Sequence, residues 1–183
     1  EYQWLNFQHE AIRQIMHGTL IHSRIQSPRK ILDIGCGTGA VSVHLAERFP
    51  NAEVVGIDIS PVPDVHARPS NLSYRQGNIL DLPGEWNFIF SRLLLAGMHD
   101  WPRYVGTMYR LLSPGEWAEL QDVSVCVFDA QENDISADWK YMIATMQSIG
   151  KLGMDGRIGI HLPEYVRDCG FIEIQIKHFP WVL

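Results

Sequence analysis

The sequence predicts an α/β fold with a doubly wound, mostly parallel sheet. Two patterns lead to this prediction: short apolar runs alternate with segments of helical periodicity, and the first apolar run ends in a glycine-rich turn. The chain has 183 residues, of which 46% are hydrophobic and 20% charged, and this suffices for one globular domain with a buried core. We therefore expect a single domain, with a helical cover over residues 1–28 and an α/β core over residues 29–183.

The first elements are a helix and a strand. Phe7, Ala11 and Ile15 recur at helical spacing, which predicts a helix from Asn6 to about Ser23. The proline at position 28 then breaks the helix ahead of the first strand, over residues 30–34.

A glycine-rich turn follows this strand. Residues 30–40 read KILDIGCGTGA, an apolar run with Asp33 near its end and glycines at 35, 37 and 39. Glycine permits positive φ angles and close approach of a ligand to the backbone. Residues 41–49 have helical character. A strand, a glycine loop and a helix form the layout of a nucleotide-type cofactor site at the carboxyl end of a parallel sheet.

The charge of this turn bears on which cofactor binds. Gly35, Gly37 and Ala40 satisfy the dinucleotide pattern G-x-G-x-x-[G/A], which is a weak signal by itself. A carboxylate at Asp33 would repel a pyrophosphate, which needs backbone N–H groups and a helix N-terminus. S-adenosylmethionine has no phosphate and carries an ammonium and a sulfonium. The sequence therefore favours S-adenosylmethionine over NAD.

The second strand ends in another acid. Residues 53–60 read EVVGIDIS, so Asp58 and Ile59 lie where a carboxylate can accept from both ribose hydroxyls and an apolar side chain can pack on adenine. The alternative is that Asp58 only caps the following turn with Ser60, as Asp often does.

The remaining elements alternate in type, as a doubly wound sheet requires. Strands are predicted over residues 71–76, 86–91, 117–123 and 171–179. Helices are predicted over residues 100–112, 136–150 and 162–169. Asp100 can cap the first of these helices, whose expected buried face is Val105, Met108, Tyr109 and Leu112. Residues 113–115 (SPG) are expected to turn the chain into the fifth strand, and residues 171–176 alternate as in a sixth strand.

Composition excludes several classes of protein. The net charge of −6 argues against nucleic acid as a partner. No apolar run approaches the 18 residues of a membrane span, and no leader is visible, so a cytoplasmic location is expected, or a nuclear one for a regulator. The three cysteines are scattered and odd in number, which indicates reduced thiols. No metal-ligand spacing such as C-x₂-C is present, and we expect no metal.

With these residues in view, the chain resembles the class I S-adenosylmethionine-dependent methyltransferases, which have a Rossmann-like fold. It is most similar to the fungal branch related to the secondary-metabolism regulator LaeA. The segments that carry this closer resemblance are residues 5–9 (LNFQH), 90–103 (FSRLLLAGMHDWPR) and 111–122 (LLSPGEWAELQD). The resemblance also implies a seventh, antiparallel strand, which is missing from this chain, so we expect the sequence to be a fragment.

The resemblance further implies which residues bind S-adenosylmethionine and its product S-adenosylhomocysteine. The methionine moiety would lie against Asp33, Gly35, Cys36, Gly37 and Gly39, with Cys36 expected to be a small packing residue. Ribose and adenine would lie against Asp58 and Ile59, and the adenine edge against Asn78 and Ile79. Asn78 stands where such enzymes usually have Asp, and it can still accept a hydrogen bond. Ser91 and Arg92 would face the sulfonium and the substrate.

His99 is the candidate catalytic residue. It follows the fourth strand, near where the methyl group is expected to point, and a neutral imidazole can accept a proton from an acceptor. The alternative is that His99 only packs in its loop beside Trp101, since proximity alone suffices in many such reactions.

The leading hypothesis is methyl transfer to a small-molecule acceptor, a secondary metabolite. The main alternative is a regulator of the LaeA type that acts through protein partners, and a homodimer is also possible in either case. A reaction other than methylation, with the cofactor as an electrostatic element, and an NAD oxidoreductase are the other hypotheses.

Overall fold

The computed structural model describes residues 2–181, which fold as two compact units. The first unit holds the described parts of residues 1–92, 106–120 and 175–183, and the second holds residues 93–105 and 121–174. None of the helices described between residues 2 and 181 has both the length and the apolar character needed to cross a bilayer.

The first unit is built on a five-stranded sheet with the order β3-β2-β1-β4-β5. Its strands are β1 (Lys30–Ile34), β2 (Glu53–Asp58), β3 (Leu72–Gln76), β4 (Trp86–Arg92) and β5 (Leu112–Gln121). β1 pairs in parallel with β2 and β4, and β2 pairs in parallel with β3. Strand order reverses at β1, so the carboxyl ends of β1, β2 and β4 meet at the point where ligands bind in such sheets.

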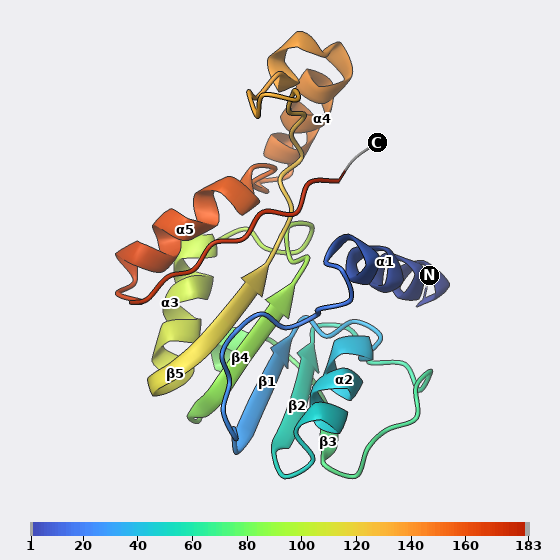
Figure 1. Ribbon diagram of the computed structural model, residues 1–183, viewed down its shortest axis with the longest axis vertical. Helices are drawn as coiled ribbons and strands as arrows, with labels where there is room; N and C mark the ends of the chain where they lie inside the picture. The colour runs from blue at the N-terminus through green and yellow to red at the C-terminus, as the bar shows by residue number, and fades with distance from the viewer. Residues whose placement is uncertain (1, 182–183) are drawn as a thin grey trace. The chain divides into compact units, whose positions relative to one another are not determined.

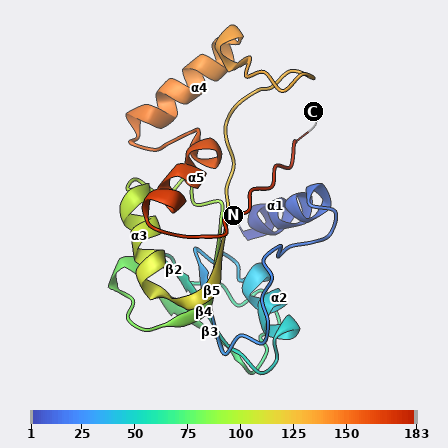
Figure 2. The same ribbon diagram turned by 60° about the vertical axis from the view of Figure 1, so that its left-hand side comes forward.

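Helices cover both faces of this sheet. α2 (Ala40–Arg48) and the second half of α3 (Trp101–Leu111) lie on opposite faces, and α1 (Tyr2–Ile15) lies beyond the arrowheads of β1 and β2 (Figures 1 and 2). The core beneath α2 includes the fully buried Ile31, Val54 and Phe88, which lie at matching registers of neighbouring strands. The central strands are buried on both faces, which explains their continuous apolar runs.

The second unit contains the 3₁₀ turn η2 (Ser136–Asp138) and the helices α4 (Lys140–Lys151) and α5 (Ile158–Asp168). Ile158 and Leu162 supply the buried face of α5. Its N-terminal end is tied by an ion pair between Arg157 and Asp134. The Asp100 carboxylate accepts from the Arg103 amide at 3.1 Å, which confirms the predicted cap of α3.

The structure corrects several predicted boundaries. α1 covers residues 2–15, because the positive φ angles of His17 (53°) and Gly18 (81°) end the helix well before Ser23. β5 begins directly after α3, so residues 113–115 lie inside the strand and form no turn. Proline is tolerated there because β5 is the edge strand of the described sheet. On α3, Val105 and Met108 are buried as predicted, whereas Tyr109 is 48% exposed.

The predicted strand over residues 171–179 is absent from the described part of the chain. This segment has no regular secondary structure, and Ile172 is 83% exposed. Alternating apolar residues form a strand only when a neighbour accepts and donates the ladder hydrogen bonds. Residues 171–179 pair with no described strand. Their alternating apolar pattern alone is therefore not enough to form one.

Candidate cofactor site

The backbone amides of the glycine loop between β1 and α2 donate hydrogen bonds within the protein, to β2 and to the loop itself. Gly35, Gly37 and Gly39 have φ angles of 64°, 55° and 83°, in the region that favours glycine. The amides of Gly35 and Cys36 both donate to the carbonyl oxygen of Ile57, at 2.8 and 3.2 Å. The Gly39 amide donates to the Cys36 carbonyl at 2.8 Å. These donors are therefore already used within the protein.

Asp33 occupies the N-terminal end of α2 from inside the core. Its side chain is 2% exposed, and it accepts a 2.5 Å hydrogen bond from Ser42 Oγ and another from the Ser42 amide. Burial raises the pKa of Asp33 to about 6, and the bonds from Ser42 and the charge of Arg92 partly oppose this shift. Ser42 lies in the first turn of α2, where free amides attract anions. Asp33 thus uses a first-turn amide of α2 that an anionic ligand could otherwise bind.

Both carboxylate oxygens of Asp58 accept hydrogen bonds from backbone amides. Oδ2 accepts from the Gly37 amide at 2.9 Å, and Oδ1 accepts from the Ser60 amide at 2.9 Å. The predicted turn cap with Ser60 is therefore present, and a second bond also reaches into the glycine loop. The neighbouring Ile59 is 70% exposed, as a surface for a flat ligand requires.

Packing against Tyr74 explains two glycines. A Cβ built on Gly39 would lie 2.7 Å from Tyr74 Cζ and closer still to its hydroxyl oxygen. A Cβ on Gly56 would lie 2.8 Å from Ser42 Oγ and 2.8 Å from Tyr74 Cδ1. Gly56 pairs with Asp33 in the sheet, so its missing side chain leaves room for the bond between Ser42 and Asp33. Sequence reasoning assigned no role to Gly56, Ser42 or Tyr74, although a glycine inside the apolar run EVVGID marks a close approach.

Asn78 and Ile79 follow β3 and begin the 3₁₀ turn η1 (Ile79–Asp81). Asn78 Oδ1 accepts from the Leu80 amide at 3.0 Å, so this oxygen caps the turn. Ile79 is 5% exposed and belongs to the core. Asn78 therefore caps the turn at an exposed position, and Ile79 anchors the same turn in the core.

The end of β4 contributes Ser91 and Arg92. Ser91 is 3% exposed. Arg92 Nη2 donates to His9 Nδ1 of α1 at 2.8 Å. Burial and the charge of Arg92 lower the pKa of His9 to about 4, so the imidazole is neutral near pH 7 and accepts from the guanidinium.

α1 is held over the glycine loop by part-buried contacts. Thr38 Oγ1 donates to Asn6 Oδ1 at 2.8 Å, and a Cβ built on Gly37 would lie 3.8 Å from Leu5 Cδ1. With the contact between His9 and Arg92, these interactions connect the segment LNFQH to the loop and to the end of β4. The predicted residues from Asp33 to Arg92 therefore converge at one edge of the sheet.

Residues 7–152 match a family model described as a methyltransferase domain. The chain belongs to this methyltransferase family.

The relatives of this methyltransferase domain include fungal enzymes and regulators. It is 30% identical over 127 residues to methyltransferase str3 of Strobilurus tenacellus, which covers 67% of the chain and 46% of the relative. It is also 30% identical over 163 residues to the secondary metabolism regulator laeA of Coprinopsis cinerea, covering 81% of the chain and 40% of the relative. The chain thus spans less than half the length of these two relatives.

The fold is that of known methyltransferases. Phosphoethanolamine N-methyltransferase 2 of Haemonchus contortus, solved with phosphomonomethylethanolamine and S-adenosylhomocysteine, superimposes with a TM-score of 0.65 and 17% identity. The superposition covers 93% of this chain and 38% of that one. It confirms the predicted doubly wound α/β class.

Cys36 lies inside the loop of the methyltransferase domain as a packed residue. Its side chain is 9% exposed, and burial raises the pKa of its thiol well above the ordinary value. A protonated thiol is a poor nucleophile. Among residues 2–181, no three or more His, Cys, Asp and Glu side chains are arranged to hold a metal ion.

His99 belongs to the second unit of the methyltransferase domain. Its side chain is exposed, and Nδ1 lies 3.3 Å from the Gly153 carbonyl oxygen. In the same unit, Asp122 accepts from the Leu94 amide at 2.8 Å and from the Val123 amide at 2.9 Å. The bond from the Leu94 amide to Asp122 connects the loop after β4 to the segment after β5. The catalytic role of His99 stays a prediction.

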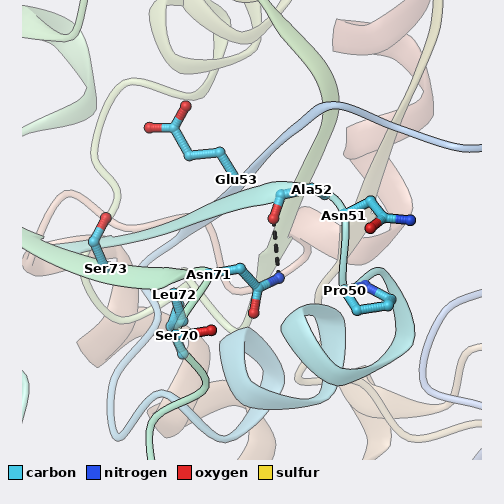
Figure 3. Close-up of a pocket in the computed structure, with 8 residues that line it drawn as sticks. All are labelled: Pro50, Asn51, Ala52, Glu53, Ser70, Asn71, Leu72 and Ser73. Carbon is cyan, nitrogen blue, oxygen red and sulfur yellow. Dashed lines mark hydrogen bonds between the residues drawn. The ribbon is translucent and has the colours of Figure 1, made fainter.

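An open pocket lies elsewhere on the first unit, at the amino ends of β2 and β3 (Figure 3). Asn71 Nδ2 donates there to the carbonyl oxygens of Ala46, Phe49 and Ala52, the last at 2.9 Å. The side-chain amide of Asn71 therefore stabilises the turn between α2 and β2. Ligands of such sheets bind at the carboxyl ends of the strands, so we place the candidate site at the glycine loop.

Proposed function

We propose that this domain binds S-adenosylmethionine at the glycine loop and transfers its methyl group to a small-molecule acceptor. One observation carries the choice of cofactor. The protein's own carboxylates, Asp33 and Asp58, already bind the amides that a pyrophosphate would need. A phosphate-free ligand with positive charges fits this arrangement, whereas NAD does not.

Electrostatics support the same ligand. Asp33 and Asp58, with Arg92 beside them, give the site one negative charge in excess. S-adenosylmethionine carries a sulfonium, an ammonium and a carboxylate, so the charges of the ligand and the site balance. Asp58 would hold the ribose hydroxyls, and the exposed Ile59 would pack on adenine. The buried Asp33 would act by attracting the cationic end and by fixing the start of α2.

When bound, S-adenosylmethionine would supply a methyl group on a sulfonium sulfur, which leaves as a neutral thioether. The protein then has to align the acceptor and exclude water. Ser91 and Arg92 at the end of β4 would border the reacting end of the ligand, and we keep His99 as the candidate base. The similarity of the chain to methyltransferase str3 supports methyl transfer. Its similarity to a secondary metabolism regulator supports a secondary metabolite as the acceptor.

A regulatory role is the second candidate, favoured by the similarity to the laeA regulator of Coprinopsis cinerea. Mass spectrometry of extracts from strains with and without the gene separates the two. One metabolite that differs by a methyl group supports the enzyme, and the loss of many unrelated metabolites supports the regulator.

Calorimetric titration with S-adenosylhomocysteine tests the cofactor site. We expect the wild type to bind, and Asp58→Asn to weaken binding by about ten- to a hundredfold, because hydrogen bonds to charged groups contribute about 1.5–3 kcal/mol. Glu53→Gln is the matched control, because Glu53 is exposed at the opposite end of the same strand. Thermal unfolding shows whether each variant is folded. Binding of NAD but not of S-adenosylhomocysteine by the wild type would contradict the proposal.

A further inference from the structure

Arg92 has a buried nitrogen with no partner. Its Nη2 donates to His9, but Nη1 has no hydrogen-bond partner among the described residues and is shielded from solvent. A guanidinium has five N–H donors, and buried donors are nearly always satisfied. The unsatisfied Nη1 therefore indicates a binding site for a ligand that accepts hydrogen bonds.

The charge of Arg92 is only partly balanced. His9 is neutral near pH 7 because burial lowers its pKa to about 4. The charge of Asp33 acts on Arg92, yet this carboxylate is hydrogen-bonded to Ser42 and forms no ion pair with Arg92 within residues 2–181. A part-buried and poorly compensated cation favours an anionic ligand.

The glycine loop is not the binding site for this anion, because its amides already have partners in the protein. The amides of Gly35, Cys36, Gly37 and Gly39 all donate to atoms of the protein. Asp33 accepts from the first turn of α2. Arg92 lies at this edge of the sheet, at the end of β4, and its planar fork matches a carboxylate.

We propose that Arg92 binds a carboxylate group through Nη1, forming an anion subsite at the end of β4. This inference rests on the proposed function, because the cofactor's own α-carboxylate is one source of the group. A carboxylate on the acceptor molecule is the other source. His9 fixes the orientation of the guanidinium by holding Nη2, which leaves Nη1 for the ligand.

Two adenosyl compounds test the first source: S-adenosylhomocysteine and its decarboxylated analogue, which lacks only the carboxylate. We expect wild type to prefer the carboxylated compound by about tenfold or more, the range of a charge-assisted hydrogen bond. Arg92→Gln is expected to abolish this preference, and Arg92→Lys to restore part of it. Asn6→Ala is the control, because it breaks the bond between α1 and Thr38 while it leaves the contact between His9 and Arg92 in place.

Benzoate tests the second source, as a probe titrated into protein loaded with S-adenosylhomocysteine. If the acceptor supplies the carboxylate, wild type binds benzoate and Arg92→Gln does not, while the preference between the adenosyl compounds is unchanged. If Arg92→Gln alters neither measurement, the subsite is disproved. If Asn6→Ala reproduces the whole effect of Arg92→Gln, the loss comes from the displacement of α1, and the subsite is also disproved.

The proposed function can fail separately. Wild type would then bind neither adenosyl compound. Benzoate titration of the free protein, wild type against Arg92→Gln, would still decide the subsite.

Discussion

A Gly39→Ala variant is expected to lose about 4 kcal/mol of unfolding free energy. The φ angle of Gly39 is 83°, which costs an L-residue about 1–2 kcal/mol. The new Cβ would also lie 2.7 Å from Tyr74 Cζ, and overpacking of this kind costs about 1–3 kcal/mol. Urea unfolding followed by circular dichroism measures the loss. S-adenosylhomocysteine binding is expected to fall with it, because the loop has to move.

Gly18→Ala is the matched control for this variant. Gly18 has nearly the same φ angle, 81°, but a Cβ there meets no heavy atom within 4 Å. It is expected to lose only the backbone part, about 1–2 kcal/mol. Adding Tyr74→Phe to Gly39→Ala removes the nearest atom and is expected to recover part of the stability. Equal losses in Gly39→Ala and Gly18→Ala would show that Tyr74 does not pack on the loop.

The buried Asp33 predicts a second large effect, on the pH dependence of stability. Its pKa in the folded protein is raised from 3.8 to about 6, so the protonated form favours folding. This contribution is complete below about pH 4 and is lost as pH rises to about 6. Each pKa unit corresponds to about 1.4 kcal/mol, so wild type is expected to lose about 3 kcal/mol relative to Asp33→Asn across this range. Urea unfolding of both proteins at several pH values measures the difference.

The comparison of wild type with Asp33→Asn separates the contribution of the Asp33 carboxyl group from that of other titrating groups. His9 titrates in an overlapping range with the opposite sign, because its lowered pKa makes the fold less stable as pH falls below about 6.5. That contribution is common to both proteins and cancels in their difference. Ser42→Ala is the second variant. The Ser42 hydroxyl lowers the pKa of Asp33, so its removal is expected to move the loss to higher pH. A difference that does not change with pH would mean that Asp33 is hydrated.

The strands of the sheet were predictable because their signals are local. β1, β2 and β4 are short apolar runs that are buried on both faces, and the glycine loop follows the first of them. The segment over residues 171–179 has an equally clear pattern but no described strand beside it, and pairing is a property of the whole sheet. The helix predicted to continue to about Ser23 would have included Met16 and Leu20, which are buried outside any helix.

The candidate site was predictable only in part. Acids that end strands beside a glycine loop mark Asp33 and Asp58, because sheet topology brings such strand ends together. The bonds from Ser42 to Asp33 and from Arg92 to His9 join residues 9 and 83 positions apart. No local pattern specifies such pairs, since they depend on strand register and on how α1 docks. Arg92 was assigned through the resemblance, and its place directly after a predicted strand was the local signal that agreed with it.

The way α1 is attached has a consequence for motion. No residue of α1 is fully buried, and its contacts with the loop and with β4 involve a few part-buried side chains. Little apolar area is therefore exposed when α1 lifts away, and this local opening requires much less free energy than unfolding the sheet. The amide protons of α1 should exchange with solvent well before those of β1 and β4. The helix that covers the glycine loop is thus expected to open more readily than the sheet next to it.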